Sequence, residues 1–467
     1  MDLTSVIIKA NAPMGIDAIV EQLYKEWLAS QDYKDMLTAN DYYRNKNDIM
    51  DKVKTYVCDG ETRTATGMAN NKVAHPIVRD LVDQKVQYLL SADWSVETEN
   101  ATWQDFLTNY YSDAFRTQLV RASRDAILKG IGWLYVWIEE GKLKTKRMLP
   151  EEVIPVWADQ DHTELDAVIR FYSTTEYVST TPKIVTYVEY WDETGVRYYK
   201  SVDGSKLKFE GENGHMEDAE GNPFLWSKLP FIPFKYNDDE VMLIQVIKSL
   251  VDDYDSKKSS MSDLLDDETN KFKVVKGYES TDPREFVRNM NTFRVAFIDD
   301  GDITELGSAP DVTGTIAYLE KTRQDIFDFG RGVDTNASMG ANASGDARQY
   351  LYAKLDLDCN DLEKGIVNGL QELNWFICNS IPNLAAFIDE KVNYMFSRNT
   401  IINEGMMLDN AIKMQSIDGI SMKTIVNYVP SIENADEEIK SWEDEQGESM
   451  TFALDPTENN EEEVDEQ

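Results

Sequence analysis

The sequence predicts a helix-rich α+β protein, and three observations support this prediction. Apolar residues recur at helical spacing over residues 15–46 and 74–91, and again through most of the chain after residue 238. Residues 131–236 are instead rich in aromatic and β-branched residues separated by turn residues, as is typical of strands. With 467 residues, the chain is also long enough for about three domains with their own cores.

Acidic residues dominate the charge: 85 acidic and 47 basic residues give a formal net charge of −38. This excludes a conventional DNA-binding protein, because affinity for DNA comes largely from Lys and Arg side chains that displace counterions. No apolar run approaches the roughly 18 residues needed to cross a bilayer. The first residues also lack the features of a secretion signal, so we expect a cytoplasmic protein without membrane contact.

Cysteine and histidine residues are too few and too scattered to predict a metal site. Cys58, Cys359 and Cys378 lie far apart or on one expected helix, and the three histidines show no ligand spacing. We therefore expect buried free thiols, no metal and no cofactor.

The amino-terminal half is expected to mix helices and strands. Residues 15–46 show the periodicity of an amphipathic helix, and Pro76 stands early in a second helix over 74–91. A third helix stops at Gly130, a residue type that commonly terminates helices. Strands follow, and the sequence "DETG" at 192–195 predicts a hairpin turn between two of them.

A long helix over 239–268, a small α/β insert over 269–310 and a returning helix over 311–329 are expected next. The apolar stripe of the first helix fades from Ser256 to Ser260 and then resumes. The insert is expected to contain two strands and a helix that opens near Pro283. This order places two long helices on either side of a compact insertion.

The most regular helix is expected over 346–381, where Pro382 ends it. Its apolar residues advance in steps of three or four: Leu351, Leu355, Cys359, Leu362, Ile366, Leu370, Leu373, Ile377 and Ile381. Further helices are expected over 382–446. From residue 431 onward the chain has 15 acidic residues and one basic residue, so we expect 447–467 to be a disordered acidic tail.

The glycine-rich stretch "GRGVDTNASMGANASG" at 330–345 does not fit a nucleotide-binding loop. Asp346 stands where a phosphate-binding loop needs Lys, and Ala347 stands where it needs Ser or Thr. The dinucleotide fingerprint fails as well, because Gly330 and Gly332 follow a helix and not a strand.

The sequence gives only weak support to other hypotheses of a catalytic or binding site. The abundant carboxylates could suggest a glycosidase, but they lie in sequences typical of turns. The loop "DQDHTE" around His162 could hold a loosely bound cation, although it lacks the pattern of a calcium loop. Lys142, Lys144 and Lys146 share one face of an expected strand, which is more typical of a solvated face than of a phosphate site. We therefore expect that the protein is not an enzyme.

The order of elements resembles a portal protein of tailed bacteriophages, the siphophage type common in phages of Gram-positive hosts. No single motif carries the resemblance; it rests on the order of several stretches. They include "NNKVAHPIVRDLVDQKVQYLLS" at 70–91, "VDDYDSKKSSMSDLLDDE" at 251–268 and "ASGDARQYLYAKLDLDCNDLEKGI" at 343–366, together with residues 148–172 and 273–279.

The resemblance implies a ring, usually a dodecamer, at one vertex of the capsid, through which double-stranded DNA is packaged and ejected. Implied partners are the terminase large subunit, the major capsid and scaffolding proteins, a head-completion (adaptor) protein and DNA bound without sequence specificity. The protein would be assembled in the host cytoplasm and belong to the virion. An alternative is another oligomeric virion or scaffold protein with no DNA channel.

The resemblance also divides the chain into regions. In portal terms, residues 1–238 resemble the wing, 239–268 and 311–329 the stem helices, and 269–310 the clip that meets partner proteins. The glycine-rich stretch resembles the tunnel loop, 346–381 the long helix behind it, and 382–446 the remaining wing and a short helical crown.

Site residues follow from these regions. Small and uncharged side chains in the tunnel loop would touch moving DNA weakly, whereas lysines would bind its phosphates. The expected DNA-facing residues are Val333, Asp334, Thr335, Asn336, Ser338, Met339 and Asn342. The expected stem residues are Lys257 and Lys258, and the expected clip contacts are Lys276, Tyr278, Arg284 and Arg288.

Overall fold

The structure is a computed structural model that describes most of the chain. It covers residues 15–58, 60–65, 68–139, 141–178, 181–217, 223–268, 273–276, 284, 288, 295–298, 312–335, 345–398, 404–417, 419–426, 429, 432 and 438–442. The chain divides into two units, one of residues 1–338 and 351–399 and the other of residues 339–350 and 400–467. Each unit is described by itself.

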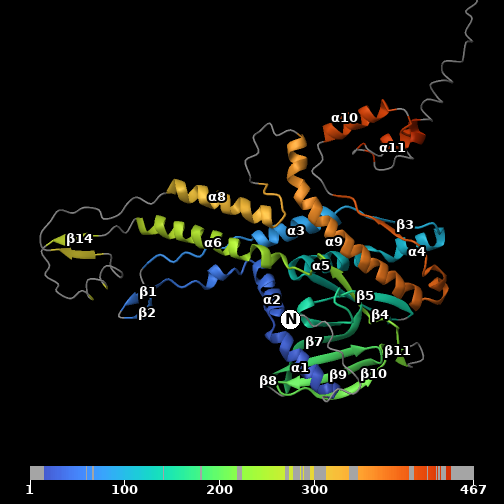
Figure 1. The fold of residues 1–467 in the computed structure, drawn as a ribbon, viewed down its shortest axis with the longest axis horizontal. Coiled ribbons are helices and arrows are strands. Elements are labelled where there is room, and N and C mark those ends of the chain that lie inside the picture. Colours follow the sequence, from blue (N-terminus) through green and yellow to red (C-terminus); the bar gives the residue numbers. More distant parts are fainter. Residues whose placement is uncertain are drawn as a thin grey trace, which may run out of the picture. The chain divides into compact units, whose positions relative to one another are not determined.

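The first helical stretch is two helices, α1 (Ile16–Ala29) and α2 (Gln31–Tyr43), where the sequence predicted one (Figure 1). Ser30 is the reason for the break. Its backbone is extended, and its hydroxyl accepts a hydrogen bond from the Tyr33 N–H at 3.1 Å, which caps α2.

Three further helices belong to this half: α3 (Ile77–Leu90), α4 (Ala101–Tyr110) and α5 (Asp113–Lys129). The predicted stop of α5 at Gly130 is confirmed. Gly130 has φ of 80°, and a Cβ there would lie 2.0 Å from the Glu240 carbonyl oxygen, so both conformation and space require glycine.

The predicted strands and one further strand, Lys208–Asn213, form two antiparallel sheets. One has the order β13 (Phe231–Lys235), β4 (Ile131–Glu139) and β5 (Lys142–Met148). The other runs from β10 (Lys208–Asn213) through β9 (Gly195–Val202), β8 (Thr181–Asp192) and β7 (Leu165–Val178) to β6 (Val153–Trp157). The predicted hairpin turn is confirmed, because Asp192 pairs with Gly195.

A buried aromatic cluster joins the two sheets. It includes Trp133 and Phe231 from the three-stranded sheet and Trp157 and Trp191 from the other. Helix α5 packs on β4 so closely that a Cβ on Gly132 would lie 2.1 Å from the Ala122 carbonyl oxygen. The sheets and α5 therefore form the layered core of the first unit.

Short strand pairs complete the described sheets. They are β1 (Thr55–Cys58) with β2 (Glu61–Thr64), β3 (Ser95–Glu97) with β16 (Asn393–Met395), and β11 (Met216–Glu217) with β12 (Pro223–Phe224). None of these pairs was predicted from the sequence, because most of the strands are too short to show an alternating pattern.

The long helix α6 (Leu243–Glu268) and the returning helix α8 (Val312–Phe329) belong to the first unit and pack against each other (Figure 1). Two strands of the expected insert, β14 (Lys273–Lys276) and β15 (Val295–Ile298), pair in parallel. Parallel pairing requires a crossover between the strands. The helix expected near Pro283 lies outside the described residues, apart from two exposed arginines, Arg284 and Arg288.

The longest described helix, α9 (Gly345–Ser380), confirms the predicted stripe. Leu355, Cys359, Leu362, Ile366, Leu370, Leu373 and Ile377 are all fully buried. The helix packs tightly on β13, because a Cβ on Gly365 would lie 2.0 Å from the Lys235 carbonyl oxygen. After Ile381 the chain continues as a 3-10 helix, η3 (Pro382–Phe387).

Cys359 and Cys378 are buried free thiols, as predicted, while the side chain of Cys58 lies outside the described residues. Within the described part of the chain, no helix is long and apolar enough to span a bilayer. The second unit contains α10 (Glu404–Gln415) and α11 (Met422–Val426), which pack against each other. The expected acidic tail, 447–467, lies outside the described residues.

Candidate functional site

The start of the glycine-rich stretch, residues 330–335, is held in place within the first unit by contacts with α3, α8 and α9. We call these six residues the mount. Gly330 and Gly332 lie directly on Leu81 of α3: a Cβ on Gly330 would be 2.8 Å from Leu81 Cδ1, and one on Gly332 would be 2.2 Å from Leu81 Cδ2. Both glycines therefore permit close packing of the backbone on α3.

Gln84 of α3 pairs with the backbone of the mount. Its Oε1 accepts a hydrogen bond from the Val333 N–H at 2.7 Å, and its Nε2 donates to the Val333 carbonyl at 3.0 Å. The Val333 side chain is 4% exposed and packs with Tyr88, Leu355 and Cys359. One side chain thus satisfies both polar backbone groups of Val333.

An ion pair fixes the next residue. Arg323 of α8 donates from Nε and Nη2 to the two carboxylate oxygens of Asp334, at 2.7 and 2.9 Å. This forked geometry is among the stronger ion-pair arrangements because it fixes orientation as well as distance. The hydrogen bonds to Asp334 raise the pKa of Arg323 further above its usual value.

A buried charged cluster lies beneath the mount. Lys85 of α3 is fully buried, and its Nζ donates to Asp358 Oδ2 of α9 at 2.5 Å and to the Arg331 carbonyl at 3.2 Å. Tyr236 donates its hydroxyl to the same Asp358 oxygen at 2.6 Å, and Arg331 reaches Oδ1 at 3.3 Å. Burial lowers the pKa of the Lys85 ammonium, and the Asp358 carboxylate opposes this change.

The predicted DNA-facing residues fall into three groups. Val333 lies in the core, Asp334 is mostly buried in its ion pair, and Thr335 is exposed. Asn336, Ser338, Met339 and Asn342 lie outside the described residues. Whether this stretch faces DNA stays a prediction; within the described residues, the Val333 side chain is buried beside Tyr88, Leu355 and Cys359.

The predicted stem and clip residues are placed only in part. Lys257 is exposed, and the ammonium of Lys258 lies 5.8 Å from the ring centre of Tyr254. Lys276 belongs to β14, but its side chain lies outside the described residues, as does all of Tyr278. Arg284 and Arg288 are both exposed. Their proposed contacts stay predictions.

The roles of four residues were not predicted from the sequence: Gln84, Lys85, Arg323 and Asp358. A signal was present for two of them. Lys85 falls among the buried positions Leu81, Val82, Val86 and Leu89 of α3, and Asp358 is adjacent to Cys359 in the stripe of α9. A charged residue at a stripe position predicts a buried ion pair, because an unpaired buried charge is costly.

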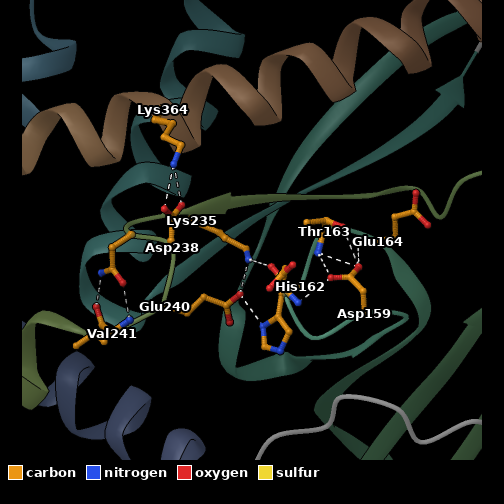
Figure 2. Close-up of polar contacts among 11 residues, drawn as sticks. Asp159, His162, Thr163, Glu164, Lys235, Asp238, Glu240, Val241 and Lys364 are labelled. Carbon is orange, nitrogen blue, oxygen red and sulfur yellow. Dashed lines mark hydrogen bonds and ion pairs between the residues drawn. The ribbon is translucent and has the colours of Figure 1, made fainter.

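A second polar cluster ties α9 to the sheets (Figure 2). Figure 2 shows Lys364 of α9 directed at the Asp238 carboxylate, at 3.0 Å, and Lys235 and His162 both meeting Glu240, each at 3.0 Å. The Lys364–Asp238 pair holds the turn between β13 and α6 against α9, and the two contacts to Glu240 hold the same turn to β13 and to the loop of His162.

In the loop around His162, suggested above for a loosely bound cation, the Asp159 carboxylate is occupied by hydrogen bonds from the loop itself. Asp159 accepts hydrogen bonds from the backbone N–H groups of Asp161, Thr163 and Glu164 and from the Thr163 hydroxyl (Figure 2). The bonds from Thr163 and its neighbours lower the pKa of Asp159 to about 2. Among the described residues, no group of three His, Cys, Asp or Glu side chains is arranged to hold a metal ion.

One carboxylate near the carboxyl-terminal end of α9, that of Glu372, has an unusual pKa. Glu372 lies in a groove beside Trp375, and its nearest cation is Lys228, whose Nζ is 3.9 Å from Glu372 Oε1. Burial raises the pKa of Glu372 to about 7, while Lys228 acts in the opposite direction. The side chain nevertheless remains 27% exposed.

The fold and the mount define a protein in which two long helices flank an insert with parallel strands, and a segment after the second helix is fixed through its backbone. Over residues 28–451 the chain matches the family described as "Phage portal protein, SPP1 Gp6-like". The chain therefore belongs to the phage portal protein family, which confirms the resemblance and the portal function that it implied.

Two curated relatives agree. The chain is 28% identical over 416 residues to the portal protein of Bacillus phage SPP1, with 86% of this chain and 82% of the relative covered. It is 24% identical over 431 residues to the portal protein of Clostridium phage phiCD119, with 88% of this chain and 92% of the relative covered. Both phages infect Gram-positive bacteria, as the resemblance predicted.

Proposed function

We propose that the chain forms a closed ring with a central channel at one capsid vertex, through which double-stranded DNA is packaged and later ejected. The observation that carries this proposal is the family match over 28–451, combined with the α6–α8 pair and its parallel-stranded insert. The ring acts as a structural conduit, and the energy for packaging comes from the terminase.

The surface of the α6–α8 pair suits a ring. Leu264 and Leu265 on α6 are 51% and 58% exposed, and Val312 and Ile316 on α8 are 40% and 44% exposed. Apolar residues exposed on helices of one chain can be buried against the next copy when a heterologous interface closes on itself. This supports α6 and α8 as stem helices at subunit contacts.

The remaining regions follow the same proposal. Residues 1–238 form the wing, 269–310 the clip that docks the terminase and then the head-completion protein, and 382–446 the remaining wing and crown. The major capsid and scaffolding proteins are the proposed partners of the ring during capsid assembly. Non-specific contact with DNA is assigned to 335–345, since the printed contacts of the mount hold its residues before Thr335 and leave Thr335 exposed.

The high net negative charge supports a conduit for DNA. A channel wall that repels phosphate offers few binding positions, so DNA can slide without repeated release from Lys or Arg. With a formal net charge of −38, the chain has ample acidic side chains for such a wall.

The stem assignment can be tested with a matched pair of substitutions. Leu265→Asp places a charge on the proposed subunit contact, whereas Ile184→Asp places one on the five-stranded sheet at a side chain of similar exposure, 59%. We expect only Leu265→Asp to abolish rings when the protein is co-expressed with its scaffolding protein and examined by analytical ultracentrifugation. Equal ring formation by both variants would exclude α6 from the subunit contact.

A further inference from the structure

Helix α6 holds an extended segment of the chain through a regular series of polar side chains. The Asp255 Oδ1, Ser259 Oγ and Asp263 Oδ1 atoms accept hydrogen bonds from the backbone N–H groups of His75, Val73 and Asn71, at 3.2, 2.9 and 2.6 Å. We call Asp255, Ser259 and Asp263 the ladder, and residues 71–75 the arm. The ladder explains why the apolar stripe of α6 fades near Ser259.

The spacing of the ladder matches the spacing of the arm. Four residues of helix rise by about 6 Å, and two residues of an extended chain span about 6.6 Å. Every second N–H of the arm therefore meets an acceptor one helical turn further along α6, with the two segments running in opposite directions.

The ladder is buried and its other polar atoms have partners. Asp255 and Ser259 are fully buried and Asp263 is 5% exposed. Asp255 also accepts from Asn47 Nδ2 at 2.6 Å, and Asp263 pairs with Lys54 at 3.0 Å. Buried polar groups that are satisfied in this way fix one geometry, because any shift leaves an unpaired group in the core.

Helix α3 connects the arm to the mount. It begins at Ile77, two residues after His75, and its next two turns carry Leu81, Gln84 and Lys85. These are the side chains that contact Gly332, Val333 and the Arg331 carbonyl. A single rigid helix thus joins the arm held by α6 to the residues that hold the mount.

We propose that α3 positions the mount according to the position of α6, with Ser259 and its ladder neighbours as positioning residues. A displacement of α6 moves the arm, the arm moves α3, and Gln84 carries the movement to Val333. This role goes beyond the proposed conduit, and it concerns contacts within one chain. A direct route from α6 through α8 is the competing explanation.

The test measures amide exchange in the full-length chain by mass spectrometry. Ser259→Ala removes the acceptor for the Val73 N–H and leaves α6 and α8 packed together. We expect amides in 71–75 and in 331–333 to exchange about 3- to 10-fold faster, the range that corresponds to one hydrogen bond. Peptides from β8 should be unchanged, which excludes general destabilisation.

Three variants make the result specific. Ser259→Thr keeps the hydroxyl and should restore slow exchange at 331–333. Tyr318→Phe removes the 2.9 Å hydrogen bond between α8 and Asp253 of α6 and should leave 331–333 unchanged. Gln84→Met should in turn speed exchange in the arm, because coupling between two sites is reciprocal.

Acceleration confined to 71–75 in Ser259→Ala would overturn the proposal, and so would acceleration at 331–333 in Tyr318→Phe alone. If Ser259→Ala does not fold, Lys54→Met weakens the hold on Asp263 and is judged by the same two peptides. The readout does not depend on ring formation, so failure of the conduit proposal and failure of this one are distinguishable.

Discussion

Gln84 and Val333 form a two-way pair: the Gln84 side chain accepts from the Val333 N–H at 2.7 Å and donates to its carbonyl at 3.0 Å. The residues are 249 positions apart in the chain. Their pairing means that the glycine-rich stretch begins from a fixed point on α3, which gives the residues after Thr335 a defined origin.

Close packing at Gly332 predicts a strong effect of one added methyl group. A Cβ there would lie 2.2 Å from Leu81 Cδ2, and Leu81 is fully buried and has little room to move. We expect Gly332→Ala to lower the free energy of unfolding by about 1–3 kcal/mol, measured by urea denaturation. Gly211→Ala, where no atom lies within 4 Å, is the control. Equal stability of the two variants would contradict the packing described here.

The buried pair of Lys85 and Asp358 predicts a non-additive response. Lys85→Met leaves the Asp358 carboxylate buried without its closest cation and should cost about 3–5 kcal/mol. The double variant Lys85→Met/Asp358→Asn removes both charges, so we expect it to regain part of this loss. Denaturation of the two single variants and the double variant measures the coupling. Additive losses would show that the two groups do not interact.

Glu372 predicts a dependence of stability on pH. The pKa of this carboxyl rises from 4.5 to about 7 on folding. Between these values the unfolded chain releases the proton and the folded chain retains it, so stability falls as pH rises from about 4.5 to about 7. We expect Glu372→Gln to be more stable than the parent at pH 8, by about 1–3 kcal/mol, and equally stable at pH 4. A constant difference at both pH values would contradict the shift.

If the glycine-rich stretch contacts DNA, positive charges placed in it should increase the retention of DNA by the ring. Asn336→Lys/Asn342→Lys adds two positive charges to each subunit, and these should hold DNA phosphates in the channel. We expect rings of this variant to retain DNA at low salt and release it at high salt, measured by filter binding across a salt series. Asn336→Gln/Asn342→Gln is the uncharged control. Equal retention of DNA by both variants would show that this stretch does not contact DNA.

Much of the fold could be predicted from local signals. The stripe of α9, the stop of α5 at Gly130 and the hairpin at Asp192 each depend on residues close in sequence, so periodicity and turn chemistry were sufficient. The break at Ser30 was missed because the apolar spacing continues across it, while the hydroxyl of Ser30 caps a new helix.

The mount could not be predicted in the same way. In the sequence, Gly330 and Gly332 served only to reject a nucleotide-binding loop, whereas in the structure they permit close packing on Leu81, which is distant in sequence. Gln84, Arg323 and Asp358 converge from three helices, and no local pattern reports such convergence. Only the charged residues on otherwise apolar stripes, such as Lys85, indicated a buried ion pair.

The central claim is that copies of this chain enclose a channel for DNA. Single-particle electron microscopy of the protein assembled with its scaffolding protein tests it most directly. We predict closed rings with a central channel wide enough for a DNA duplex, with the α6–α8 pairs side by side around it. Stable oligomers whose axis is filled, or open filaments without a channel, would contradict the account and favour a virion or scaffold protein that conducts no DNA.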